Sequence, residues 1–133
     1  LFIYSSCNNQ KEKYINIVRI ELEKLDDQLL NNYSYVVIIP GSGCSGCITE
    51  AENFYIKNKD SKKIFFVFTD ILSIKSIKLK VGKDVIEREN VFFDKNDAFL
   101  SNDYNEKIYP LIFNIKEKDN IRYHFLNSNE ELN

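Results

Sequence analysis

Two of the three cysteines in this 133-residue chain have the spacing of a redox pair. Cys44 and Cys47 enclose Ser45 and Gly46, and they follow an apolar run that ends at Pro40. A helix that begins at Cys44 would place unpaired backbone N–H groups and a partial positive charge beside its sulfur, which lowers the pKa of the thiol from roughly 8.5. Cys47, one turn later, can then attack a mixed disulfide and release the partner. We therefore expect Cys44 to be the exposed nucleophile and Cys47 to be the shielded resolving thiol.

The pattern around this pair predicts alternating strands and helices. Residues 35–40 and 64–68 are apolar runs without polar alternation, which is typical of strands buried on both faces. Helical spacing of apolar residues predicts a helix over residues 44–57. A second helix with Ile74, Ile77 and Val81 on one face is expected between a capping Asp70 and Gly82. The cysteine pair should therefore lie at the first turn of a β-α-β unit.

The remaining segments are less regular. Residues 91–93 predict a short strand, residues 94–103 a polar loop, and residues 111–115 and 121–126 the two strands of a hairpin. Near the N-terminus, residues 21–31 predict a helix and residues 15–20 fit either a helix or a strand. The polar residues 8–14 suggest a tether.

The order of strand, Gly-Cys-Ser-Gly-Cys, helix, strand, helix and proline-opened hairpin resembles the thioredoxin-like thiol-disulfide oxidoreductases, over roughly residues 35–126. The resemblance implies an α/β fold, a thioredoxin-like sandwich whose central mixed sheet is flanked by helices and holds residues 36–39 and 64–68 as parallel strands. It implies an enzyme that performs thiol-disulfide exchange on a protein or peptide substrate, with no cofactor beyond the cysteine pair. An upstream membrane or periplasmic electron donor would recharge it.

In that family a cis proline faces the cysteine pair, and the residue before it pairs with the extended substrate. The resemblance therefore implies a cis bond between Tyr109 and Pro110, and substrate binding by these two residues together with Gly43 and Ser45. The chain also departs from the usual pattern.

Four departures stand out. Gly43 and Gly46 occupy positions where thioredoxins usually have Trp and often Pro, and the buried acid of thioredoxin would fall near Ile38. The family normally ends in a helix, whereas few residues follow Leu126. The resemblance thus leaves the substrate and the reduction potential open.

The N-terminal residues suggest an envelope protein. An apolar stretch closed by small residues and Cys7 resembles the lipobox of bacterial lipoproteins, in which the cysteine becomes acylated, although Tyr4 stands where an aliphatic residue is usual. On this interpretation residues 1–14 are a signal-peptide remnant and tether, residues 15–133 form the thioredoxin-like domain, and the protein lies in the bacterial cell envelope, periplasm-facing or lipid-anchored. The alternative is a short N-terminal strand with an incidental cysteine.

Composition excludes other partners. The chain has 20 acidic and 18 basic residues, a net charge of −2, and scattered lysines, so we expect no nucleic-acid partner. The nearest approach to a basic cluster, Lys78, Lys80 and Lys83, is typical of a solvated helix face. No apolar run reaches the roughly 18 residues of a membrane span, so contact with a membrane is expected only through Cys7.

Three other interpretations of the cysteine pair remain. A structural zinc site needs four ligands, and only Cys7 and His124, at opposite ends of the chain, could complete it. A purely structural disulfide would close a loop so small that it restrains little chain entropy. A thioredoxin-like binding module, in which the cysteines are not catalytic, is the principal alternative to the enzyme.

Overall fold

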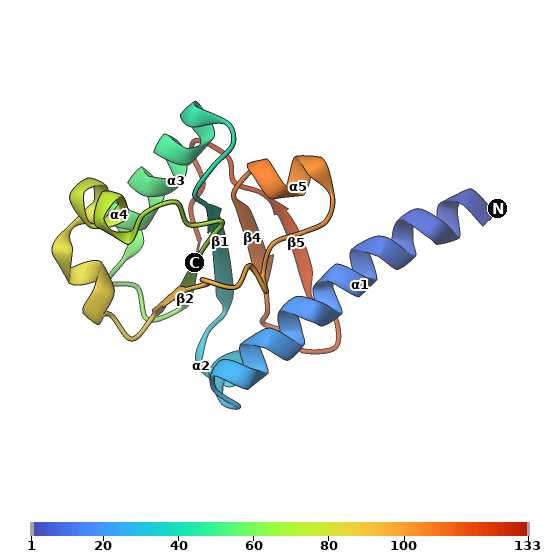
Figure 1. Ribbon diagram of the computed structural model, residues 1–133. Coiled ribbons are helices and arrows are strands. Elements are labelled where there is room, and N and C mark those ends of the chain that lie inside the picture. Colours follow the sequence, from blue (N-terminus) through green and yellow to red (C-terminus); the bar gives the residue numbers. More distant parts are fainter. Residues whose placement is uncertain (1, 133) are drawn as a thin grey trace.

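The computed structural model describes the backbone of residues 2–132 and the side chains of residues 9–132. It is an α/β structure built on one five-stranded mixed sheet of order β3-β2-β1-β4-β5 (Figure 1). The parallel strands are β1 (Tyr35–Pro40), β2 (Ile64–Thr69) and β3 (Val91–Phe93). β4 (Leu111–Asn114) runs antiparallel to β1, and β5 (Arg122–Phe125) completes the hairpin. The predicted α/β class, mixed sheet and parallel pairing of the first two strands are confirmed.

The central strand β1 is buried along its whole length and divides the core into two parts. Successive side chains of a strand point to opposite faces, so Val36 and Ile38 contribute to one core and Val37 and Ile39 to the other. Each face of the sheet is covered by different helices. This is why β1 and β2, which are buried on both faces, show no alternation of apolar and polar residues.

One face is covered by α1 (Phe2–Leu25), the long helix that extends beyond the sheet (Figure 1). Tyr14, Val18 and Leu22 recur every four residues, and their side chains are buried against the sheet. The core on this side consists of Tyr14, Val18, Leu22, Leu29, Leu30, Val36, Ile38, Phe65, Val67, Phe99, Leu111, Phe113, Ile115 and Ile121.

The other face is covered by α3 (Ser45–Asn58), α4 (Ile74–Val81) and the short 3-10 helix η1 (Lys83–Glu87). Its core consists of Tyr35, Val37, Ile39, Ala51, Phe54, Tyr55, Ile64, Phe66, Phe68, Val81, Val85 and Ile112. Leu126 and Leu132 pack against this core from the C-terminal segment, where the structure has no helix.

The N-terminal predictions need correction, because residues 2–25 form one continuous helix. Residues 8–14, expected to be a tether, are helical, and so are residues 2–7, for which a short strand was the alternative. For residues 15–20, which fitted either a helix or a strand, the helix is confirmed. The predicted helix over residues 21–31 is also wrong in its bounds, since α1 ends at Leu25 and α2 (Leu29–Asn32) follows. The backbone of Cys7 lies in α1, but its side chain is outside the described residues. Within residues 2–132, no helix combines the length and apolarity needed to cross a bilayer.

Two loop predictions also change. Ser73, and not Asp70, caps α4 by accepting the Ser76 N–H at 3.2 Å, whereas Gly82 ends the helix as predicted. A short helix that the sequence analysis missed, α5 (Tyr104–Ile108), follows the polar loop and is capped by Asp103.

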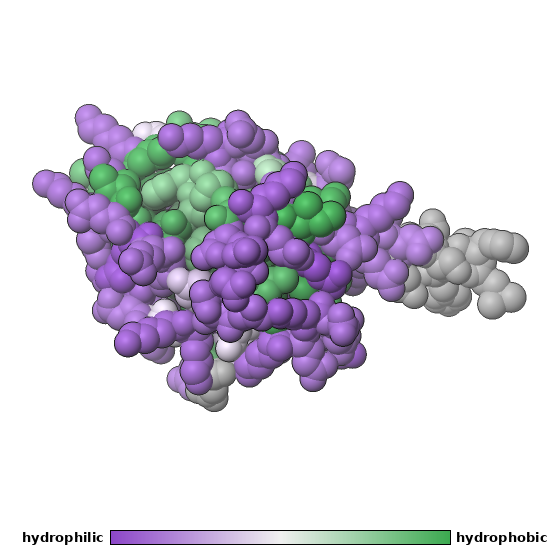
Figure 2. Space-filling view, turned by 90° about the horizontal axis from the view of Figure 1, so that it is seen from below, coloured by the Kyte–Doolittle hydropathy of each residue, from purple (hydrophilic) through white to green (hydrophobic). Residues whose placement is uncertain are grey.

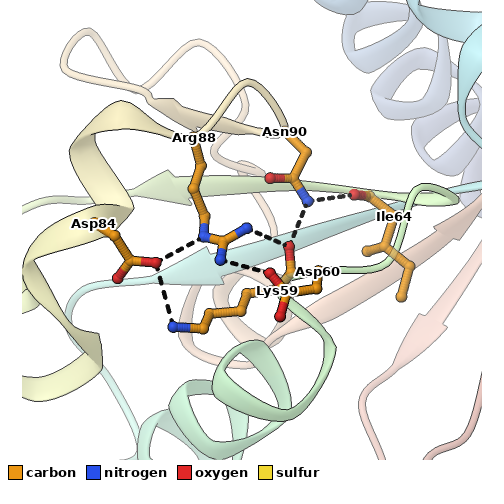
Figure 3. A network of polar contacts seen from close by, with 6 residues as sticks. All are labelled: Lys59, Asp60, Ile64, Asp84, Arg88 and Asn90. Atoms are coloured by element: carbon orange, nitrogen blue, oxygen red, sulfur yellow. Dashed lines mark hydrogen bonds and ion pairs between the residues drawn. The ribbon is translucent and has the colours of Figure 1, made fainter.

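A polar network fixes the C-terminal end of α3 at the amino ends of the strands (Figure 3). Arg88 donates to Asp60, to Asp84 and to the carbonyl of Lys59, and Asn90 donates to the same carbonyl at 3.1 Å. Because Cys44 and Cys47 lie at the opposite end of α3, this network holds the helix from its far end.

Figure 2 views the molecule from the end of the sheet at which this network lies. In this view apolar side chains reach the surface on the side of α4 and η1, at the left.

Candidate functional site

The cysteine pair lies where the sequence predicted it, at the carboxyl end of β1 and the beginning of α3. Cys44 is the N-cap residue, with an extended backbone (φ −65°, ψ 114°), and Cys47 is in the first turn. The two residues form a disulfide with Cα atoms 5.2 Å apart. Sγ of Cys44 accepts a hydrogen bond from the backbone N–H of Cys47 at 3.3 Å. A donor at the helix start therefore already points at the sulfur on which negative charge would develop on reduction.

Both cysteines are half-buried in the disulfide form. Ser45 and Gly46 between them are exposed. The predicted order of attack, Cys44 before Cys47, concerns the reduced protein.

The expectation of a cis bond before Pro110 is wrong. None of the described peptide bonds is cis, so Tyr109–Pro110 is trans, the form that an X-Pro bond prefers by about 0.5–1 kcal/mol. Tyr109 has an extended backbone (φ −114°, ψ 143°), which carries the chain directly from α5 into β4. The carbonyl of Pro110 accepts the Leu126 N–H at 3.0 Å, so this acceptor is occupied within the hairpin.

The segment before Pro110 nevertheless lies against residues 41–44, which connect β1 to α3 and are called the cysteine loop below. β1 pairs with β4 so that Ile38 is opposite Leu111. Pro110 directly precedes Leu111 and therefore lies at the carboxyl end of β1, where the cysteine loop leaves the sheet. Gly43 has φ +133°, and a Cβ atom there would lie 2.7 Å from the carbonyl oxygen of Ile108. The fold thus requires glycine at position 43, where the resemblance suggested a substrate-binding residue.

A group of polar side chains that the sequence analysis did not assign to the site surrounds the same loop. The hydroxyl of Ser42 donates to Oδ2 of Asp70, and the N–H of Asp70 donates to Oδ1 of Asp97 at 3.0 Å. Beneath them, buried Asp94 accepts the Thr69 hydroxyl at 2.9 Å. Asp70 and Asp94 each follow a short apolar strand. Acidic residues after strands are common in loops, so no specific signal in the sequence indicated this network.

A small cavity of about 110 Å³ lies between α3 and α4, next to the cysteine loop. Its lining includes Pro40, Gly41 and Ile48, and also Leu72, which is 80% exposed. The cavity has the volume for one aliphatic side chain and no room for a large cofactor.

The described side chains around the cysteine pair do not form a metal site. Within the described residues, no three side chains of His, Cys, Asp or Glu gather as metal ligands. His124 lies on β5 and contacts Glu130 at 3.0 Å. The zinc interpretation therefore has no ligand set in the part of the chain that the structure describes.

Comparisons with protein-family models, characterised proteins and solved structures find no match to this chain. The function must therefore be argued from the geometry of the cysteine pair.

Proposed function

We propose that this protein performs thiol-disulfide exchange on protein or peptide substrates through Cys44 and Cys47, on a fold of the thioredoxin-like type. The hydrogen bond from the Cys47 N–H to Sγ of Cys44 carries the proposal, because a donor at a helix start stabilises the thiolate that must attack. The partly exposed disulfide and the β-α-β setting support it.

In the reductive direction, the Cys44 thiolate attacks one sulfur of a substrate disulfide. A mixed disulfide forms, and the other substrate sulfur leaves as a thiolate that takes a proton from water. Cys47 then loses its proton and attacks Sγ of Cys44, which releases the second substrate sulfur. Two electrons pass to the substrate, and an external dithiol must reduce the pair again. Oxidation of a substrate follows the same steps in reverse.

A binding module is the second candidate function. The trans bond at Pro110 favours it, since the resemblance associated a cis proline with substrate pairing. In a module the Cys44–Cys47 disulfide would stay closed, whereas in the enzyme it must open and close at physiological potentials.

The reduction potential and a trapping experiment distinguish the two functions. Both use a Cys7→Ser background, which removes the third cysteine. Exchange proteins have potentials between about −270 and −120 mV, whereas structural disulfides lie below about −300 mV. We expect a value in the first range, and we expect the reduced protein to react with iodoacetamide at Cys44 before Cys47.

The Cys47→Ser variant should then accumulate mixed disulfides with substrate proteins, all released by dithiothreitol, because it has an attacking thiol and no resolving thiol. Cys44→Ser is the matched control and should trap little. A potential below −300 mV together with no trapping would favour the binding module.

We also propose, from the sequence alone, that Cys7 is acylated and that the protein works in the cell envelope. Mass spectrometry of the N-terminal peptide from the native protein tests this. An unmodified Cys7 inside a longer cytoplasmic chain would exclude it.

A further inference from the structure

Two residues other than glycine have a left-handed backbone in the described chain, and both belong to the network around the cysteine loop. They are Asp70 (φ 51°) and Asp97 (φ 56°). The left-handed region costs an L-residue roughly 1–2 kcal/mol, although Asp and Asn tolerate it better than most. Strain of this kind persists only where the surrounding contacts hold it. The contacts of Asp70 and Asp97 must therefore hold this part of the structure in place.

The contacts clamp the loop before Cys44 to the end of β2. The Ser42 hydroxyl donates to the carboxylate of Asp70, whose N–H is held by Asp97. Gly41 donates its N–H to the Thr69 carbonyl at 2.8 Å. A Cβ atom on Gly41 would lie 3.2 Å from the carbonyl carbon of Asp70, so the two backbones are in close contact.

The clamp is close enough to the reactive sulfur to control its position. Ser42 precedes Cys44 by two residues, which limits the separation of their Cα atoms to about 7 Å. The intervening Gly43 has no side chain, so the direction in which Cys44 enters α3 depends on where the loop is held, by Asp70 at Ser42 and by the close contact of Gly43 with Ile108.

We propose that Asp70 is a positioning residue for thiol-disulfide exchange: through its hydrogen bond with Ser42 it keeps Sγ of Cys44 at the start of α3. The inference deepens the proposed function and rests on it for the identity of the reaction. Asp70 also brings a negative charge near the thiolate, which opposes thiolate formation. The hydrogen bond and the charge therefore act in opposite directions, and substitutions can separate them.

Three variants make the separation. Asp70→Asn keeps an acceptor for Ser42 and a residue type that tolerates the left-handed backbone, and it removes only the charge. Asp70→Gly keeps the backbone conformation and removes the acceptor. Ser42→Ala removes the donor. Asp26→Asn, at an exposed turn near α2, is the matched control because its carboxylate also accepts a hydrogen bond, in this case from the backbone N–H of Gln28.

The assay measures the rate at which dithiothreitol reduces the disulfide and the pH midpoint for alkylation of Cys44 in the reduced protein. Both Asp70→Gly and Ser42→Ala should slow exchange about tenfold, the effect of losing one hydrogen bond to a charged group. Their double variant should be no slower than either single one, because both remove the same bond. Asp70→Asn should exchange within about threefold of the parent and shift the alkylation midpoint to lower pH, and added salt should reduce this difference because it screens the Asp70 charge of the parent. Asp26→Asn should change neither quantity.

The outcomes separate the two proposals. If the parent protein itself exchanges as slowly as a structural disulfide, the proposed function fails. If the parent exchanges rapidly but Asp70→Gly and Ser42→Ala stay within twofold of it, or their effects multiply in the double variant, the positioning role is refuted and the function stands. Urea unfolding of each variant, measured in parallel, ensures that only folded proteins are compared, and Ser42→Ala still tests the hydrogen bond if Asp70→Gly unfolds.

Discussion

Replacing Gly43 by alanine tests the close approach between the cysteine loop and the end of α5. Gly43 has φ +133°, which side chains rarely adopt, and this costs about 1–3 kcal/mol for a residue with a Cβ atom. The new methyl group would also lie 2.8 Å from Cα of Ile108, so backbone must move, at a further cost of about 1–3 kcal/mol. We therefore expect Gly43→Ala to lower the free energy of unfolding by about 2–6 kcal/mol.

Urea unfolding of the oxidised protein measures this loss. The chain has no Trp, so circular dichroism or tyrosine fluorescence is the appropriate signal. We expect the midpoint to fall while the slope with denaturant stays unchanged, because the folded and unfolded states keep their compactness. The total stability of a domain is typically about 5–15 kcal/mol, so the loss is a large fraction of it.

Gly46→Ala is the matched control for this experiment. Gly46 lies in the first turn of α3, its backbone is not left-handed, and no atom lies within 4 Å of an added Cβ. The free energy of unfolding should stay the same or rise by up to about 1 kcal/mol, since alanine restricts the unfolded chain. The reasoning is refuted if Gly43→Ala and Gly46→Ala unfold at the same urea concentration.

Three further predictions concern the rest of the molecule. Burial raises the pKa of Tyr55 to about 12, so stability should fall as pH rises above 10, where the unfolded tyrosine releases its proton and the folded one keeps it. Tyr55→Phe should make this fall in stability less steep. It should also raise the free energy of unfolding at pH 7 by up to about 1 kcal/mol, because the buried hydroxyl has no partner among the described residues. Urea midpoints between pH 7 and 11 check both effects. Arg88→Lys should lower the free energy of unfolding by about 1–3 kcal/mol, because one ammonium group cannot donate to two carboxylates and the Lys59 carbonyl as the guanidinium does. Thermal unfolding measures this loss, and an unchanged midpoint would contradict it. On α1, Leu22→Ala should cost about 2–5 kcal/mol and Ile20→Ala less than about 0.5 kcal/mol in the same assay, since Leu22 is 0% and Ile20 53% exposed; equal losses would mean that α1 does not pack as described.

The sheet and the cysteine helix were predictable because their signals are local. The runs over residues 35–40 and 64–68 have a composition suited to burial on both faces, and both are strands. The cysteine pair was located correctly for the same reason, since a buried strand followed by glycines and apolar residues at helical spacing leaves few alternatives.

The N-terminal helix was not predictable in its full length. Tyr14, Val18 and Leu22 carry the helical period, but the polar residues before Tyr14 contain no apolar stripe, and such a segment looks like a tether. The structure continues the helix through it.

The missed parts of the site depend on contacts between distant residues. Ser42 meets Asp70 across 28 positions of the chain, and Gly43 meets Ile108 across an even longer separation. No periodicity in one segment encodes such a meeting. The cis bond at Pro110 was inferred from resemblance alone, and the observed trans bond shows that an element order can be shared without the detail.

The division of the core by the central sheet has a consequence for how this protein can change. Side chains under α1 and side chains under α3 and α4 belong to separate clusters, so substitutions on the two faces should act on stability additively. The α1 face meets the network around the cysteine loop at Tyr14, whose hydroxyl donates to the carbonyl of Phe99, and the N–H of Phe99 donates to Asp94. At the other buried α1 positions, Val18 and Leu22, stability can be gained or lost without touching that network, so engineering or evolution can adjust durability and chemistry separately.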